Sequence, residues 1–171
     1  MRLLGAVLIL GATMWFGAYF AGKEKYRLQE LEELERALLL LQGQISYLSA
    51  PLPEVLASIS WKMEGAIGTA FWTAAERMAE RDGATAEEIW QEVWEEELRH
   101  TFLNREDAEA LLLFGRSLGY LDKSQQEGSI RLFLRYIEGA LAQGRKRLEK
   151  NGRLYYGIGC LSGLLLVVTL L

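Results

Sequence analysis

Glu97 and His100 are the residues whose types and spacing come closest to a metal-binding motif. A Glu-x-x-His pair supplies two ligands from one helical turn in di-iron helical bundles, where a second such pair and two further carboxylates complete the site. His100 is the only histidine in the chain, so a site of this kind cannot be completed. We interpret His100 as a surface or capping residue near a helix end, and we predict no metal and no cofactor.

Cys160 is the only cysteine, and it offers little chemistry. It cannot form an internal disulfide bond, and it lies in an uncharged segment without a histidine partner that would activate a thiol nucleophile. The sequence also lacks a Gly-x-x-x-x-Gly-Lys phosphate loop and a zincin motif. We therefore expect no catalytic residues and no enzyme activity.

The run of glutamates between residues 87 and 97 is the main candidate for a partner-binding surface. On a helix, four of these side chains share the face opposite the apolar residues: Glu88, Glu92, Glu95 and Glu96. Spacings of four residues bring like charges together, which destabilises an isolated helix by about 0.2–0.5 kcal/mol per pair. Only Glu95 has a basic residue, Arg99, four places on. A face that only needed solubility could include lysines, so we predict that this one binds a basic surface on a cytoplasmic partner. The alternative is an ordinary solvated face.

The charges of the chain are distributed unevenly. Residues 3–22 and 154–171 contain none, whereas residues 23–153 carry a formal charge of −5. An acidic domain without a basic stripe argues against a nucleic-acid partner. The chain has only two prolines and no Ser/Pro-rich stretch, which argues against a disordered protein.

The two uncharged end segments are each just long enough to cross a membrane. A bilayer core of roughly 30 Å needs about twenty residues of α-helix. We therefore predict transmembrane helices over 1–22 and 154–171. Gly159 and Gly163 in the second segment permit close packing against another membrane helix, although glycine is also common in such helices without this role.

A cleaved signal peptide is the alternative interpretation of the first segment. Cleavage needs small residues at positions −3 and −1 of the cut. Cuts after Ala18 and Ala21 would place the aromatic residues Phe16 and Tyr19 at −3. We therefore predict that the segment is retained as a membrane anchor.

The cations that flank the two spans predict the orientation of the chain. Eight Lys and Arg residues, from Lys23 to Arg27 and from Arg145 to Arg153, lie on the inner sides of the spans, and only Arg2 lies outside. Because cations gather on the cytoplasmic side of a membrane, we predict that residues 23–153 form a cytosolic domain.

The central segment is predicted to be all-α, because no stretch alternates apolar and polar residues for long enough to form a strand. We expect a bundle of about six helices. Their expected ranges are 23–48, 53–60, 64–81, 86–99, 105–118 and from 123 into the second span. Thr85, Asn104 and Asp122 are expected to cap the last three helices, and Gly119 is expected to stop the fifth.

Apolar seams on the first and last helices of this bundle predict that the two pack in antiparallel orientation. The first seam consists of Leu31, Leu34, Leu38, Leu41, Ile45 and Leu48. The other consists of Ile130, Leu134, Ile137, Leu141, Gly144 and Leu148. No leucine occurs between residues 57 and 97, so we expect large aromatic rings to fill the core there. These rings are Trp61, Phe71, Trp72, Trp90 and Trp94.

Three stretches of this chain resemble the stage III sporulation protein AB family of endospore-forming bacteria. The amino terminus, Met1-Arg-Leu-Leu-Gly-Ala-Val-Leu-Ile-Leu-Gly-Ala-Thr13, is similar to the start of that family. Phe114-Gly-Arg-Ser-Leu-Gly-Tyr-Leu-Asp122, followed by Gln125-Gln126, resembles its interior motif. Tyr155-Tyr-Gly-Ile-Gly-Cys-Leu-Ser-Gly163 resembles its carboxyl terminus. The resemblance covers the whole chain in length and layout.

The resemblance implies a subunit of the multiprotein channel across the double membrane between mother cell and forespore. The soluble part of the family is similar to the helical domain of inner-membrane platform proteins in type II secretion and type IV pilus systems. Such platforms couple a cytoplasmic secretion-type ATPase to the membrane apparatus. The expected partners are therefore the membrane, the sporulation ATPase and other channel subunits, with a homo-oligomer left open. The alternatives are a membrane enzyme subunit whose active site is completed by a partner, and a generic membrane-anchored adaptor.

Overall fold

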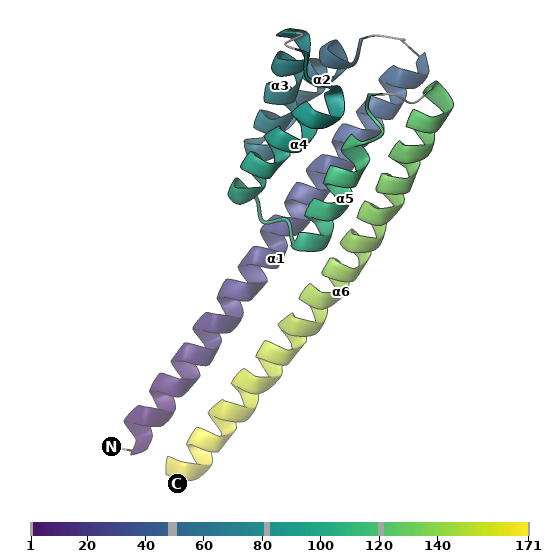
Figure 1. The fold of residues 1–171 in the computed structure, drawn as a ribbon. Helices are drawn as coiled ribbons and strands as arrows, with labels where there is room; N and C mark the ends of the chain where they lie inside the picture. Colours follow the sequence, from purple (N-terminus) through teal and green to yellow (C-terminus); the bar gives the residue numbers. More distant parts are fainter. Residues whose placement is uncertain (1, 48–50, 81–82, 120–121, 171) are drawn as a thin grey trace. The chain divides into compact units, whose positions relative to one another are not determined.

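The computed structural model describes the backbone of residues 2–47, 51–80, 83–119 and 122–170, and the side chains of 22–45, 51–80, 83–119, 122 and 124–150. Over these residues the chain is all-α, as predicted, with six α-helices, one 3₁₀ helix and no strand (Figure 1). The elements are α1 (Arg2–Tyr47), α2 (Leu52–Ser60), α3 (Gly65–Glu80), α4 (Ala86–Glu97), η1 (Leu98–His100), α5 (Arg105–Gly115) and α6 (Lys123–Leu170).

The chain divides into two compact units. One consists of Arg27–Leu141, and the other combines Met1–Tyr26 with Ala142–Leu171. Over the described residues, no helical segment is both long enough and apolar enough to cross a membrane. The predicted spans, 1–22 and 154–171, lie outside the residues whose side chains are described, apart from Gly22. The predicted domain limits at 22 and 153 stay predictions.

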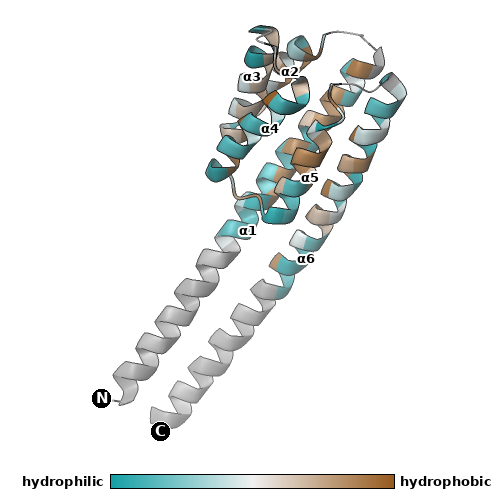
Figure 2. Cartoon of the chain, viewed as in Figure 1, coloured by the Kyte–Doolittle hydropathy of each residue, from teal (hydrophilic) through white to brown (hydrophobic). Residues whose placement is uncertain are grey.

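The leucine seam of α1 lies in the core of the Arg27–Leu141 unit. Leu31, Leu34, Leu38 and Leu41 are each exposed by 1% or less. Ile45 is only half-buried, and Leu48 lies outside the described residues. In Figure 2 the helices of this unit carry both hydrophobic and hydrophilic residues, as amphipathic helices do.

The start of α6 contributes its own apolar seam to the same core. Ile130, Leu134, Ile137 and Leu141 are buried there. Within the Arg27–Leu141 unit, α1 and α6 run in opposite directions, as the sequence predicts (Figure 1). Their spacings of three and four residues place each seam on one side of its helix, which explains why both seams are buried.

Side-chain caps open α4 and α5, as expected. The Thr85 hydroxyl accepts a hydrogen bond from the Glu88 backbone N–H, and the Glu88 carboxylate accepts one from the Thr85 N–H, which completes a capping box. Asn104 and Asp107 form the same reciprocal arrangement at the start of α5. The Asp122 carboxylate accepts a hydrogen bond from the Gln125 N–H, in the first turn of α6.

Two predicted helix ends are shifted. α5 ends at Gly115 rather than just before Gly119, because the next residues form tight turns in which Arg116, Ser117 and Leu118 each donate to the carbonyl three places back. α2 begins at Leu52 rather than at the predicted Pro53, which occupies an early helical position where a missing N–H costs no hydrogen bond.

An aromatic cluster fills the core between α3, α4 and α5. Trp90 and Trp94 of α4 are fully buried, and Phe71 of α3 meets both rings edge-on, with centroids 5.5 and 6.0 Å away. Phe114 of α5 packs against Trp90 from the other side at 5.7 Å. These contacts confirm the prediction that aromatic rings replace leucine in this part of the core.

Trp61 and Trp72, however, do not belong to this core. Trp61 is 79% exposed and Trp72 is 41% exposed, so the prediction that they fill the interior is wrong. Trp61 follows the last residue of α2, where the chain turns outward, and Trp72 lies next to the buried Phe71 but on the outer side of α3. Consecutive helical residues point about 100° apart, which explains why only one of the two neighbours is buried.

Candidate partner-docking surface

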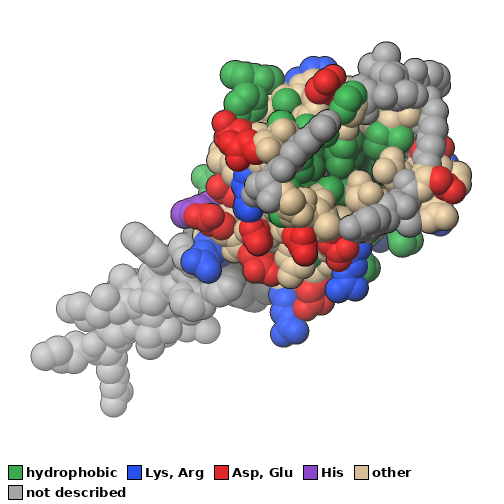
Figure 3. All heavy atoms as spheres, turned by 45° about the horizontal axis from the view of Figure 1, so that its top comes forward, with side chains coloured by type: hydrophobic (Ala, Val, Ile, Leu, Met, Phe, Trp, Pro, Cys, Tyr) green, Lys and Arg blue, Asp and Glu red, His purple; other side chains and the backbone are tan. Residues whose placement is uncertain are grey.

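The predicted acidic face of α4 is formed as the sequence indicates. Glu88, Glu92, Glu95 and Glu96 are all exposed, whereas Ile89, Trp90, Val93 and Trp94 on the other side of the helix are buried. The aromatic core therefore fixes the rotation of α4, and this rotation presents the carboxylates to solvent. Figure 3 shows acidic side chains with some Lys and Arg among them on the viewed face of the molecule.

Glu88 has a structural role in addition to its place on this face. Its carboxylate accepts hydrogen bonds from the Thr85 backbone N–H at 2.8 Å and from the Thr85 hydroxyl at 3.0 Å. These hydrogen bonds stabilise the ionised form and lower the pKa of Glu88 below its usual value. Glu88 thus stays negatively charged while it caps the helix.

Glu92 has a cationic partner that helical spacing within α4 could not reveal. Arg77 of α3 donates to the Glu92 carboxylate at 2.6 Å. On the same helix, Glu95 accepts a hydrogen bond from Gln91 at 2.9 Å. The repulsion expected along the face is therefore partly offset by one contact within α4 and by the Arg77–Glu92 pair, which depends on the tertiary fold.

The acidic character extends over the whole segment from α2 to α4. Residues 52–97 contain eleven acidic and three basic residues, a formal charge of −8, whereas the complete chain carries −4. The rest of the chain is consequently basic overall. A surface with this charge favours a cationic partner and speeds its approach.

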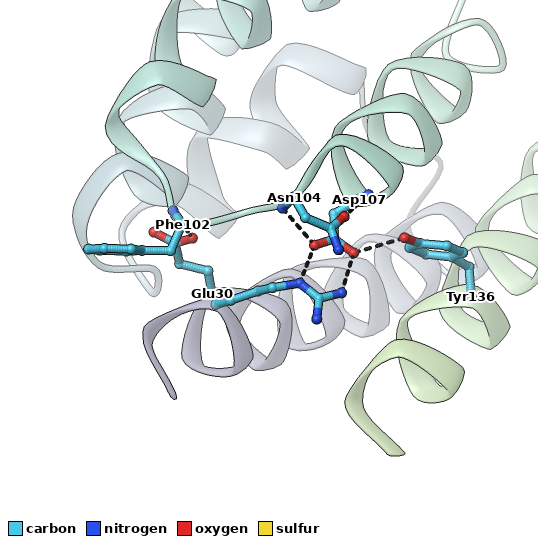
Figure 4. A network of polar contacts seen from close by, with 6 residues as sticks. Glu30, Phe102, Asn104, Asp107 and Tyr136 are labelled. Carbon is cyan, nitrogen blue, oxygen red and sulfur yellow. Dashed lines mark hydrogen bonds and ion pairs between the residues drawn. The ribbon is translucent and has the colours of Figure 1, made fainter. Parts of the chain in front are cut away.

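A buried ion pair that sequence reasoning missed connects three helices (Figure 4). Arg27 of α1 donates to the Asp107 carboxylate of α5 through Nε at 2.6 Å and through Nη2 at 2.9 Å, and the Tyr136 hydroxyl of α6 donates to it at 2.8 Å. Asp107 is 1% exposed and Arg27 is 7% exposed. The Asn104 N–H donates to the same carboxylate, as part of the cap of α5.

This network changes the interpretation of Arg27. Arg27 is one of the cations that flank the first predicted span, but its side chain is buried against α5. The Asn-x-x-Asp spacing from Asn104 to Asp107 was the available signal for the capping half of the network. The pairing of Arg27 with Asp107 bridges 80 residues and has no local signature.

Burial and hydrogen bonding shift two pKa values around this network. Burial, followed by the hydrogen bond to Asp107 and its negative charge, raises the pKa of Tyr136 far above its usual range. Glu30 lies on the next turn of α1 and accepts a hydrogen bond from the Phe102 N–H at 2.6 Å. Desolvation of the half-buried carboxyl raises its pKa despite that bond.

An apolar groove of about 530 Å³ lies between α5 and α6. Phe114, Phe133 and Tyr136 line it, and the Phe133 ring stacks on both of the others. Leu113 and Leu132 at this groove are 59% and 62% exposed. The groove is thus an exposed apolar surface, and the Tyr136 hydroxyl at its edge is engaged in the bond to Asp107.

The remaining sequence candidates are His100 and, in the second predicted span, Gly159 and Gly163. His100 is exposed at the end of η1, which agrees with a surface residue near a helix end. Within the described part of the chain, no group of three His, Cys, Asp or Glu side chains is arranged to hold a metal ion. Gly159 and Gly163 lie outside the residues whose side chains are described.

The described part of the chain is thus an all-α bundle with an acidic face on α4 and the exposed rings of Trp61 and Trp72. The sequence model of the family described as stage III sporulation protein AB matches residues 2–171. The chain therefore belongs to the stage III sporulation protein AB family, as the sequence motifs indicated, and has a role in sporulation.

A relative and a solved structure of this family are similar to the chain. Stage III sporulation protein AB of Bacillus subtilis (strain 168) is 28% identical over 171 residues, which cover 100% of this chain and 99% of the relative. A solved structure of stage III sporulation protein AB has a TM-score of 0.68 at 22% identity, and the match covers 72% of this chain and 97% of that one. The match to the solved structure supports the fold.

Proposed function

We propose that this protein is a membrane-anchored platform subunit of a secretion-like channel that sporulating cells need. Its helical bundle lies in the cytosol and couples a cytoplasmic secretion-type ATPase to the membrane apparatus. Family membership supports the sporulation role, and the two uncharged end segments support anchoring in a membrane. The membrane is the forespore-facing one of the mother cell.

At the level of residues, the main support for this proposal is the acidic face of α4. Glu95 and Glu96 are exposed, have no part in the helix cap, and lie in a segment of formal charge −8. A complementary basic surface on the ATPase would be attracted over about 10 Å at moderate salt, and the association would weaken as salt increases. We assign no catalytic role to the chain, because the ATPase supplies the chemistry in this scheme.

Site-specific crosslinking in sporulating cells tests the proposed partner. A photo-crosslinking amino acid replaces Glu95 or Glu96 in the full chain, and the same amino acid replaces Glu138, an exposed residue of α6, as a matched control. We expect the α4 positions to capture the sporulation ATPase and the control to capture much less. Equal capture from Glu138, or no capture from α4, would contradict the proposal.

A further inference from the structure

Two exposed tryptophans form an open aromatic corner where α2 meets α3. The Trp61 and Trp72 rings have centroids 5.4 Å apart and planes inclined at 69°. They border a hollow of about 400 Å³. Its other walls include Met63, Gly65, Gly68 and Thr69.

Two glycines shape the backbone at this hollow. Gly65 starts α3 with a φ of 58°, which side chains rarely adopt. A Cβ at Gly68 would come within 2.7 Å of the Met63 carbonyl oxygen, so this position also excludes a side chain. Both rings are exposed at this hollow, although burying such a ring would remove on the order of 150–250 Å² from water. A large ring left exposed beside another is typical of the anchor residues of protein interfaces.

The charges around this corner favour a cationic group as its occupant. Trp72, Glu76 and Glu80 are exposed at intervals of four residues and share one face of α3. Glu64 is exposed just before the helix. Lys62, which follows Trp61 in the chain, is an exposed cation that partly balances these negative charges. The faces of indole rings attract cations, and arginine stacks on them through a planar and weakly hydrated guanidinium. Figure 3 shows exposed hydrophobic side chains close to acidic ones.

We infer that the corner between Trp61 and Trp72 receives an arginine side chain of the basic partner that docks on α4. This inference rests on the proposed function and adds an anchor point to it. The guanidinium stacks against the rings, while the carboxylates of α3 and α4 attract the surrounding positive charge. The ring contact is short-ranged, so salt should weaken it much less than the attraction by the carboxylates.

Binding of short labelled peptides to the full chain in detergent micelles tests the anchor. The probes are a fluorescent arginine-containing peptide and two copies of it in which citrulline or lysine replaces each arginine. The variants are Trp61→Ala, Trp61→Phe and, as a control at another exposed apolar residue, Leu132→Ala. Because Trp61 is 79% exposed, its replacement should leave the fold intact, which circular dichroism checks.

We expect Trp61→Ala to weaken binding of the arginine peptide by about two- to fivefold, at low and at high salt, and Trp61→Phe to weaken it less. The citrulline peptide should bind poorly, and the lysine peptide should bind more weakly than the arginine one. Unchanged binding by Trp61→Ala, or equal binding of the arginine and citrulline peptides, would overturn the anchor. If the anchor is overturned in this way but positions 95 or 96 still crosslink to the ATPase, the proposed docking on α4 stands without the anchor.

Discussion

Asp107 shows how much a single residue organises in this bundle. Its carboxylate accepts two hydrogen bonds from Arg27, one from Tyr136 and one from the Asn104 backbone, so one side chain joins α1, α5 and α6. A buried ion pair of this kind costs desolvation energy and becomes favourable only when the remaining polar atoms are satisfied. The four bonds to Asp107 meet that condition.

Replacing Asp107 by Asn should destabilise the fold by about 3–5 kcal/mol, because the buried Arg27 charge loses its counter-charge. Denaturant unfolding of the full chain in detergent, followed by tryptophan fluorescence, measures this effect. Glu109→Gln is the matched control, because the Glu109 and Arg105 side chains of its ion pair are 63% and 91% exposed, and solvent screening should leave this pair little effect on stability. Equal losses in the two variants would contradict the role given to Asp107.

Tyr136 predicts a pH dependence at the alkaline end. Its pKa is raised above the ordinary value of 10.0, so the folded state holds the hydroxyl proton more tightly than the unfolded state. The stabilisation that the Tyr136 hydroxyl contributes is complete below pH 10.0. It is lost as the pH rises from there toward the higher pKa of the folded state. We expect the stability difference between wild type and Tyr136→Phe to stay constant from about pH 8 to about pH 9 and to shrink as the pH rises through 10.0 to about 11. A difference that stays constant over the whole range would contradict the prediction.

At the scale of elements, the contact between α4 and α5 depends on Gly115. A Cβ added there would overlap the Trp90 indole, whose Nε1–H donates to the Leu111 carbonyl at 3.1 Å. Gly115→Ala should therefore destabilise the bundle by about 1–3 kcal/mol through overpacking. Gly139→Ala is the control, because nothing lies within 4 Å of its added Cβ and helix propensity alone should stabilise α6 by about 0.5–1 kcal/mol. If a denaturation assay found Gly115→Ala to be more stable than Gly139→Ala, the result would contradict this account of the α4–α5 contact.

The elements themselves were largely predictable from the sequence. Local chemistry determines them: Thr85 and Asn104 cap their helices as expected, and the α1 leucines have the spacing of one helix face. Side-chain partners between elements were not predictable in the same way. The pairing of Arg77 with Glu92, or the outward direction of Trp61, depends on how the helices are rotated against each other, and one sequence carries no local signal for that rotation.

At the scale of the whole molecule, charge separates the chain into regions with different expected surroundings. Residues 3–22 and 154–171 are uncharged, whereas residues 52–97 (α2 to α4) carry a formal charge of −8. An uncharged segment of about twenty residues is stable within a bilayer, and a strongly acidic one is not. This contrast is the physical reason to expect membrane anchors at the ends and a solvated surface between them.

Labelling of single cysteines tests the orientation in intact protoplasts of vegetative cells made to produce the protein, where the reagent reaches the outer face of the membrane. In a Cys160→Ser background, Ser124→Cys reports on the bundle, because Ser124 is exposed at the start of α6, and Leu171→Cys reports on the end of the second predicted span. We expect a membrane-impermeant reagent to label position 171 from outside and to reach position 124 only after lysis. Labelling of position 124 in intact protoplasts would overturn the cytosolic placement.

The association rate between the full chain in detergent and the sporulation ATPase tests the central claim most directly. In one variant Glu88, Glu92 and Glu96 become Gln, and Gln at position 88 can still complete the helix cap. A control variant makes the same change in charge at three exposed residues outside α4: Glu106, Glu109 and Glu138. We predict that the α4 variant associates at least about tenfold more slowly at low salt, that its rate approaches that of wild type at about 0.5 M salt, and that the control stays close to wild type throughout. Equal association rates for the α4 variant and wild type at low salt would contradict the claim that this face binds a basic partner.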